Sequence, residues 1–488
     1  MNQNHTMMQF FEWHLLPDGT HWKRLKELAP ELKKSGIDSI WIPPATKAQT
    51  PEDTGYAVYD LYDVGEFDQN GSVRTKYGTK QELEEAIAAC QENDICIYAD
   101  IVMNHKAGAD DTETFKVVEV AQDDRTKEIS EPFNIDGWTK FTFPGRKDQY
   151  SSFKWNMEHF NGTDYDEGTV RTGVFRILGE NKGWNENVDK EFGNYDYLMF
   201  ANIDYNHPTV RSEMIKWGKW FSKNFKLDGF RIDAVKHIDF TFIRDFAKEM
   251  IKENGEDFYM VGEYWNPDLQ ACQTYLDNID HTIDLFDVPL HYKLHQASLE
   301  GRDFDLTTVF DDTLVTSNPL NAVTFVDNHD SQPDESLESW VEDWFKQSAY
   351  ALILLRKDGY PCVFYGDYYG VGGEQPVGTK RKLIDPLLYV RSHKAYGEQH
   401  DYFDHPNTIG WVRMGVDERE GSGCAVVISN GDDGDKRMFV GKERAGQVWT
   451  DYTGNCPEKI TIEEDGFATF LVKGGSVSVW ALPDDEEE

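Results

Sequence analysis

Short apolar runs alternate with longer segments of helical periodicity through most of this 488-residue chain, and this alternation strongly limits how it can fold. The apolar runs predict strands at 8–13, 39–42, 95–103, 229–234, 259–264, 282–286, 322–326 and 361–364. Helical periodicity is clearest at 22–34, 80–92, 211–224, 241–253 and 344–356. Strands joined through helices pair in parallel, and eight of them can close on themselves. The pattern therefore predicts an α/β fold, a closed (β/α)8 TIM barrel.

Two long segments do not follow this alternation. Residues 104–206 are rich in Gly, Asp and aromatic residues and carry short β-like pieces at 139–143 and 174–177. This segment is too long for a loop and predicts a β-rich subdomain inserted after the third strand. Beyond residue 398, short alternating strands separated by turn signals predict a C-terminal antiparallel β-sandwich. The predicted domains are the barrel at 1–103 and 207–398, the inserted subdomain at 104–206 and the sandwich at 399–488.

The composition argues against several classes of partner. The chain has 49 Lys and Arg residues against 88 Asp and Glu, a formal net charge of −39 that repels nucleic acid and anionic membranes. It contains no run of about 18 apolar residues that could span a bilayer. The first residues lack the pattern of a secretory signal, and the six cysteines are scattered without metal-ligand spacing. We expect a cytoplasmic monomer with reduced thiols that binds neither nucleic acid nor membranes. A secreted protein from which a signal has been removed is the alternative that this pattern leaves open.

Polar residues gather where the predicted barrel strands end, which is the face that carries active sites in such barrels. These polar segments are 100–105, 229–237, 262–265 and 326–330, with 55–60 near the second strand. Each segment alone could be structural. Their joint occurrence at one rim favours a functional site.

The segment 229–237 reads Gly-Phe-Arg-Ile-Asp-Ala-Val-Lys-His. Alternation along a strand puts Arg231 and Asp233 on the same face. A carboxylate beside an always-charged guanidinium stays ionised and can act as a nucleophile. Taken alone, such a pair is more often a structural ion pair at a strand end than a catalytic one.

Two further carboxylates, Glu263 and Asp330, follow later strands at the same rim. Cleavage of an acetal needs a protonated acid for the leaving oxygen as well as an ionised carboxylate near the anomeric carbon. Glu263 has Val261, Tyr264 and Trp265 around it, and we expect no adjacent cation, so its protonated form should be favoured. Asp330 follows His329 and could stabilise positive charge on a sugar ring, or could instead cap a turn.

These segments, together with Tyr56 and with Trp13 in a Phe-Phe-Glu-Trp sequence, resemble the α-amylases of glycoside hydrolase family 13, in the family's order and over nearly the whole chain. The resemblance is to the liquefying bacterial type, and within it to the cytoplasmic bacterial enzymes. It implies that Asp233 is the nucleophile, Glu263 the acid/base and Asp330 the transition-state stabiliser. The implied substrate contacts are Trp13, Tyr56, His105, Arg231, Lys236, His237, Trp265 and His329.

The resemblance also implies a calcium ion between the inserted subdomain and the barrel. Its implied ligands are Asn104, Asp196, Asn202 and the backbone carbonyl of His237. Where the liquefying type carries further acidic metal ligands, this chain has Asn161 and Asn185, and at a third site Asn407 and Asn430. An amide oxygen ligates calcium without contributing charge. We therefore expect one calcium site, of reduced affinity, and loss of the additional metal cluster.

The expected activity is endo-hydrolysis of internal α-1,4 bonds in starch, glycogen and maltooligosaccharides, with retention of configuration. The Lys236-His237 pair resembles that of enzymes that cut such bonds rather than α-1,6 bonds. Transglycosylation or exo-release of short units remains an alternative within the family. A glucan-binding protein without catalysis is a further alternative, against which the three intact carboxylates argue. No added starch-binding module is evident, so soluble glucans are the expected substrates.

Overall fold

The computed structural model describes residues 4–484, so residues 1–3 and 485–488, at the outer ends of the first and last predicted domains, lie outside it. Its centre is a closed barrel with the strand order β1-β16-β15-β14-β13-β12-β5-β2 and parallel pairing throughout. The strands are β1 (Met7–Gln9), β2 (Ser39–Ile42), β5 (Cys96–Ile101), β12 (Gly229–Ile232), β13 (Tyr259–Gly262), β14 (Asp284–Phe286), β15 (Ala322–Phe325) and β16 (Tyr360–Phe364). The predicted (β/α)8 barrel is confirmed.

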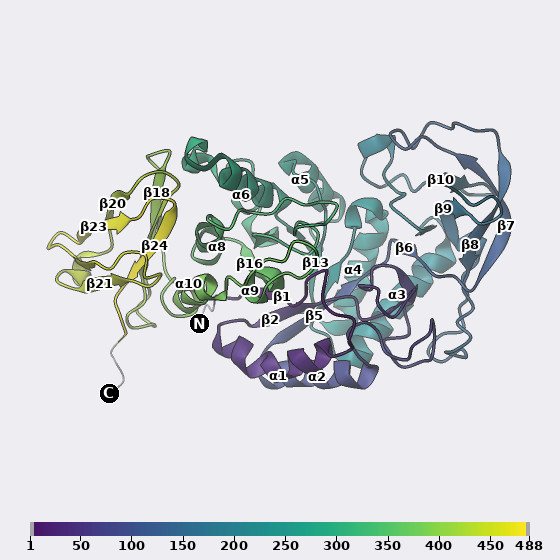
Figure 1. Cartoon of the computed structure of the whole chain (residues 1–488), viewed down its shortest axis with the longest axis horizontal. Coiled ribbons are helices and arrows are strands. Elements are labelled where there is room, and N and C mark those ends of the chain that lie inside the picture. Colours follow the sequence, from purple (N-terminus) through teal and green to yellow (C-terminus); the bar gives the residue numbers. More distant parts are fainter. Residues whose placement is uncertain (1–3, 485–488) are drawn as a thin grey trace.

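Helices surround the barrel, as Figure 1 shows. They are α1 (His21–Lys34), α2 (Lys80–Glu92), α3 (Pro208–Phe225), α4 (Phe240–Asn254), α5 (Leu269–Asn278), α6 (Val288–Glu300), α7 (Leu314–Ser317), α8 (Lys346–Leu354), α9 (Tyr365–Tyr369) and α10 (Arg381–His393). In α4 the buried residues Phe242, Phe246 and Met250 recur at the spacing of one helix face. Asp239 begins this helix by accepting hydrogen bonds from the backbone N–H groups of the next turn. No helix within residues 4–484 is both long and apolar enough to cross a membrane.

Between β5 and α3 the chain forms a separate antiparallel sheet at one end of the molecule (Figure 1). Its order is β6-β11-β9-β10-β7-β8, with β6 (His105–Lys106), β7 (Asp111–Glu119), β8 (Phe133–Lys140), β9 (Phe160–Asp166), β10 (Arg171–Ile177) and β11 (Ala201–Ile203). This sheet is the β-rich insertion expected after the third barrel strand.

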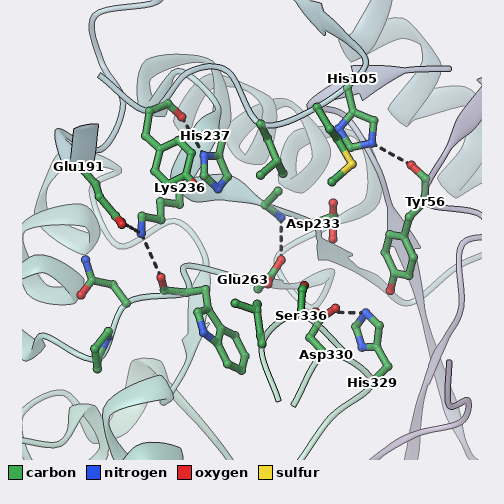
Figure 2. Close-up of a pocket in the computed structure, with 18 of the residues that line it drawn as sticks. Tyr56, His105, Glu191, Asp233, Lys236, His237, Glu263, His329, Asp330 and Ser336 are labelled. Atoms are coloured by element: carbon green, nitrogen blue, oxygen red, sulfur yellow. Dashed lines mark hydrogen bonds and ion pairs between the residues drawn. The ribbon is translucent and has the colours of Figure 1, made fainter. Parts of the chain in front are cut away.

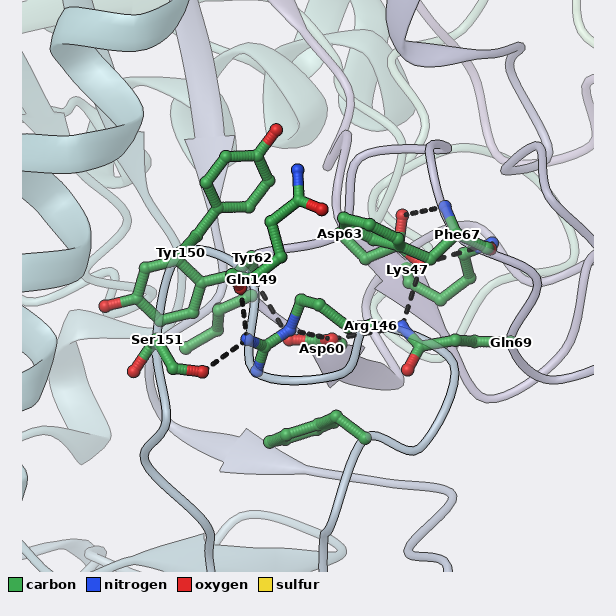
Figure 3. Close-up of polar contacts among 12 residues, drawn as sticks. Lys47, Asp60, Tyr62, Asp63, Phe67, Gln69, Arg146, Gln149, Tyr150 and Ser151 are labelled. Carbon is green, nitrogen blue, oxygen red and sulfur yellow. Dashed lines mark hydrogen bonds and ion pairs between the residues drawn. The ribbon is translucent and has the colours of Figure 1, made fainter.

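A buried polar network joins the insertion to a small hairpin of the barrel, formed by β3 (Lys47–Ala48) and β4 (Val58–Asp60) (Figure 3). Arg146 of the insertion donates from Nε to Asp60 at 2.7 Å, and both side chains are 1% exposed. Gln69 donates to Asp60 and to Asp63, and Asp63 in turn lies 3.4 Å from the Lys47 ammonium. Because buried charges of this kind are costly unless paired, the network favours one arrangement of insertion on barrel.

The C-terminal segment forms two facing sheets at the other end of the molecule (Figure 1). One has the order β17-β18-β19-β24-β21-β22 and the other pairs β20 with β23. The strands are β17 (Gln399–Tyr402), β18 (Thr408–Arg413), β19 (Cys424–Ser429), β20 (Gly434–Phe439), β21 (Val448–Asp451), β22 (Lys459–Thr461), β23 (Phe467–Val472) and β24 (Ser476–Ala481). Trp449, Phe470 and Trp480 are fully buried in the core between the sheets. The predicted antiparallel C-terminal domain is confirmed.

Candidate active site

The polar segments at the barrel strand ends surround one cavity of about 510 Å³ (Figure 2). Asp233, Glu263 and Asp330 all line it. So do seven of the eight predicted substrate residues: Trp13, Tyr56, His105, Lys236, His237, Trp265 and His329. The eighth, Arg231, is fully buried beside the carboxylates. Residues from six separate segments of the chain therefore converge on one site.

Arg231 connects the carboxylates at the base of this cavity. In the register of β12 and β5, Arg231 lies opposite Asp100. Its Nη1 donates to Asp233 Oδ1 at 2.6 Å and to Asp100 Oδ1 at 3.0 Å. Asp100 also accepts from the Tyr56 hydroxyl at 2.8 Å and from the Trp41 indole at 3.0 Å. The charge-assisted bonds fix the orientation of the Asp233 carboxylate toward the cavity.

The expectation that Glu263 has no cation beside it is wrong. Arg231 Nη2 lies 3.1 Å from Glu263 Oε2, because β12 and β13 are neighbours in the barrel. The same oxygen accepts from the backbone N–H of Ala234 at 2.9 Å. Burial nevertheless raises the pKa of Glu263 to about 7, with the charge of Asp233 adding to the rise and Arg231 opposing it. The raised pKa supports the expected protonated form of Glu263. The cause is burial and the nearby Asp233 charge, and not the absence of a neighbouring cation.

Ala234, two residues after the end of β12, adopts a left-handed backbone conformation with φ 51° and ψ 37°. This region is uncommon for a residue with a side chain and costs free energy. The turn aims the Ala234 N–H at Glu263 and begins the short helix that carries Lys236 and His237. Ala234 thus separates Arg231 and Asp233 on one side from Lys236 and His237 on the other.

Asp330 lies in a turn after β15 that another residue closes. Asn328 Oδ1 accepts hydrogen bonds from the backbone N–H groups of Asp330 and Ser331, both at 2.9 Å. The Asp330 side chain is 24% exposed and lies 3.4 Å from the His329 ring nitrogen. Burial and the charge of Glu263 raise the pKa of Asp330 well above its usual range. Because Asn328 caps the turn, the turn does not require the Asp330 carboxylate.

Three nearly parallel rings form an aromatic wall of the cavity. Tyr56 and His329 have ring centroids 5.1 Å apart at 8°, and Trp13 and Tyr56 have centroids 5.7 Å apart at 7°. His329 Nδ1 is held by the Gln9 side chain at 2.9 Å, and His105 Nε2 contacts the Tyr56 carbonyl at 2.8 Å. Flat aromatic faces of this kind suit the apolar faces of sugar rings.

The opposite side of the cavity depends on residues of the insertion that the sequence analysis missed. Lys236 Nζ donates to Glu191 Oε2 at 2.5 Å and to the Trp265 carbonyl at 3.3 Å. His237 Nδ1 lies 2.8 Å from the Tyr195 carbonyl. Glu191 and Tyr195 both line the cavity, yet neither belongs to a polar strand-end motif. Only their nearness to the predicted metal ligand at residue 196 could have drawn attention to them.

Asp196 and the predicted metal ligand Asn202 lie in a buried amide network. Asp196 accepts from Asn161 Nδ2 at 2.7 Å and from the backbone and side chain of Asn185 at 2.8 and 2.9 Å. Asn202 donates to Asn161 Oδ1 at 2.8 Å, and the Ile203 N–H donates to the Asn104 carbonyl at 3.0 Å. Burial raises the pKa of Asp196 to about 7.

A calcium ion fits these surroundings. Asn202 Oδ1 and Asn185 Oδ1 are buried and accept no hydrogen bond in the described structure. Neutral amide oxygens and one carboxylate are ligands that Ca²⁺ takes. No group of three or more His, Cys, Asp or Glu side chains within residues 4–484 could hold a metal, so a site must draw on amide and carbonyl oxygens.

Fold and site together define a glycoside hydrolase: a (β/α)8 barrel with three carboxylates and an aromatic wall lining one cavity at its rim. The profile described as "Alpha amylase, catalytic domain" matches residues 25–404, and "Alpha-amylase C-terminal" matches residues 424–481. The chain belongs to the α-amylase family, glycoside hydrolase family 13.

Two curated relatives match over 98% of this chain. A glucan 1,4-alpha-maltohexaosidase of Bacillus sp. (strain 707) is 50% identical over 98% of this chain and 92% of that protein. The cytoplasmic alpha-amylase of Escherichia coli (strain K12) is 44% identical over 98% of this chain and 99% of that protein. The crystal structure of an Anoxybacillus alpha-amylase superposes with a TM-score of 0.67, at 17% identity, over 100% of this chain and 99% of that one, which supports the fold.

Proposed function

We propose that this α-amylase family member is an endo-acting, retaining hydrolase of internal α-1,4 bonds in starch, glycogen and maltooligosaccharides. The observation that carries the proposal is the convergence of Asp233, Glu263 and Asp330 on one cavity, with Arg231 contacting the first two. The names of two relatives, a maltohexaosidase and an amylase, describe activities on such glucans for those proteins.

In the proposed reaction, a carboxylate oxygen of Asp233 attacks the anomeric carbon while protonated Glu263 gives its proton to the leaving glycosidic oxygen. The carbon–oxygen bond breaks and a covalent glycosyl-enzyme forms. Glu263, now ionised, removes a proton from water, and the resulting hydroxide displaces Asp233 and restores the starting state. Retaining enzymes hold the two carboxyl groups about 5–5.5 Å apart. The shared contact with Arg231 supports such a close approach.

The other groups of the cavity have supporting roles in this proposal. Asp330 stabilises the positive charge that develops on the sugar ring, and the wall of Trp13, Tyr56 and His329 stacks against sugar faces. His105 holds hydroxyl groups beside the cleavage point, and Trp265 contacts the substrate from the far wall. Lys236 and His237 contact the sugar on the leaving side, where Glu191 holds the lysine ammonium in place.

Product analysis tests this function directly. With a maltooligosaccharide of defined length as substrate, the first products should be shorter oligosaccharides from internal cleavage, released as α-anomers. Proton NMR during the first turnovers separates the anomers before mutarotation, and chromatography over time gives their lengths. First products of β-configuration would contradict the retaining mechanism. Products longer than the substrate would indicate transglycosylation instead of endo-hydrolysis. Release of one unit size from a chain end would indicate exo-cleavage.

We propose one calcium ion, held by Asn104, Asp196, Asn202 and the His237 carbonyl. When bound, it would supply the cation that the buried Asp196 carboxylate lacks and would hold the insertion against the barrel. The proposal rests on the unpaired amide oxygens near Asp196. Because Asn185 and Asn161 already donate to this carboxylate, we infer a weakened affinity.

The residues at the other metal positions of the family support loss of those sites. In the insertion, Asn161 Nδ2 donates to the Gly183 carbonyl at 3.1 Å and to Asp196 Oδ2 at 2.7 Å. At the barrel–sandwich junction, the Asn430 side chain donates to the carbonyls of Gly301 and Phe304, both at 2.8 Å. Asn407 likewise donates to the Arg302 carbonyl at 2.6 Å. Protein donors thus take oxygens that a cation would otherwise need.

Metal removal is expected to destabilise the protein. At a calcium concentration 100 times the Kd, binding adds about 2.7 kcal/mol to the free energy of unfolding, and a chelator should remove it. Thermal unfolding with and without chelator, and the bound metal per chain, measure the effect. Asp196→Asn should bind no calcium and should unfold at the same temperature with or without chelator. A wild-type protein that unfolds identically in both conditions and binds no calcium would contradict the site.

We further propose that the chain acts as a cytoplasmic monomer on soluble α-glucans. All six cysteines are free thiols within the described residues, and five are buried, which is compatible with a reducing compartment. The Escherichia coli relative is cytoplasmic by its name, although that describes the relative.

A further inference from the structure

Lys346, the first residue of α8, is completely buried between two carboxylates. Its Nζ lies 2.5 Å from Asp327 Oδ2 and 2.7 Å from Asp367 Oδ1, and all three side chains are 0% exposed. The ring of Trp340 lies beneath the ammonium, 3.2 Å from Nζ to the ring centroid. Asp327 follows β15, and Asp367 lies in α9 after β16, so one ammonium ties together three segments of the barrel.

Asp327 builds the turn that presents Asp330 to the cavity. Its Oδ1 accepts from the Ser331 hydroxyl at 2.7 Å, and that hydroxyl accepts from the Asn328 N–H at 3.0 Å. Asn328 in turn accepts from the Asp330 N–H through its side chain. A continuous series of hydrogen bonds therefore runs from the Lys346 ammonium to the backbone of Asp330.

The cost of this arrangement points to a positional role. Two carboxylates and one ammonium removed from water lose their hydration, which their mutual attraction offsets only when the geometry is good. Burial raises the pKa of Asp327, and Lys346 is the strongest opposing influence. Well-packed apolar side chains of similar volume often stabilise a folded protein as much as a buried ionic group does, or more. What apolar packing cannot supply is a directed contact that fixes Asp327, and with it the turn.

We propose that Lys346 is a positioning residue for the reaction: through Asp327 it holds the 328–331 turn so that Asp330 and His329 meet the sugar ring in the correct place. The inference rests on the proposed function, because it concerns how Asp330 is held.

The test uses Lys346→Met and the double variant Lys346→Met/Asp367→Asn. The single variant leaves two buried carboxylates without a cation and can fail to fold. The double variant restores the formal net charge of the group and keeps the experiment informative. We expect the double variant to fold and its kcat on a chromogenic maltooligosaccharide to fall about 10- to 100-fold, the range that a misplacement of about 1 Å can cause. Its KM should stay within about threefold, because most of the cavity wall is unchanged.

Arg391→Met is the matched control, since it removes another buried cation, 5% exposed, at the other end of the barrel. Arg391 donates to Thr6 Oγ1 at 2.9 Å, directly before β1, and to the carbonyl of Leu354, the last residue of α8, at 2.6 Å. It should lower the Tm and leave kcat unchanged. A folded double variant with wild-type kcat, or an equal loss of kcat in Arg391→Met, would overturn the proposal. Asp330→Asn distinguishes failure of this proposal from failure of the proposed function. Full activity in that variant would refute the role assigned to Asp330 itself.

Discussion

Asp233→Asn is expected to fold normally and to lose about four orders of magnitude in kcat on soluble starch and on maltooligosaccharides. The amide has nearly the shape of the carboxylate, so the contact with Arg231 Nη1, now 2.6 Å, can persist. It cannot, however, form a glycosyl ester with the anomeric carbon. The loss should therefore appear in kcat rather than in KM.

Reducing-sugar release under saturating substrate measures this loss, and far-UV circular dichroism with thermal unfolding checks the fold. Asp268→Asn is the matched control, because it makes the same chemical change in an exposed residue. Asp268 caps α5, a role that asparagine fills equally well. Wild-type activity is expected for this control. Substantial activity in Asp233→Asn would mean that another group is the nucleophile.

Glu263→Gln should reduce kcat about 10²- to 10⁴-fold on substrates whose leaving oxygen needs a proton. The loss should be far smaller for a maltooligosyl fluoride in the first chemical step, because fluoride departs without protonation. This difference distinguishes an acid from a nucleophile, since Asp233→Asn should be inactive on both substrates. Equal losses on both substrates in Glu263→Gln would argue that the residue has no acid role in bond cleavage.

Glu263 should also set the alkaline limit of activity. Burial raises the pKa of Glu263 to about 7, so the group is protonated below that pH and loses its proton above it. Only the protonated form can donate to the leaving oxygen, and kcat should therefore fall as the pH rises through about 7. In Glu263→Gln the amide does not titrate, so this alkaline fall should be absent from the remaining activity. The pH dependence of kcat for the two proteins provides the measurement.

Much of the barrel could be predicted because its strands are short, apolar and buried on both faces, as in β15 and β2. Helix α6 escaped notice because its buried positions, which include Val288, His291 and Ser298, mix apolar with polar residues. A helix of this kind has no clean polar face, and periodicity is then a weak signal.

The site residues likewise divide into those that a local sequence pattern reveals and those that only the fold brings together. The strand-end carboxylates could be found because alternation along β12 is a local property. The contact between Arg231 and Glu263 depends on which strands are neighbours, and no spacing within a single strand reveals it. Glu191 belongs to an irregular stretch of the insertion, and only the folded chain brings it to Lys236.

The pairing of β12 with β5 carries a consequence for how the protein is made. Arg231 and Asp100 are 131 positions apart, with the whole inserted sheet between them. During synthesis β5 emerges long before its partner, so its edge is unpaired while the insertion is still being translated. An unpaired strand edge can join other chains. We expect early folding of the insertion to shorten the effective chain length between β5 and β12. If the insertion does not fold early, we expect the chain to aggregate before the catalytic centre has formed.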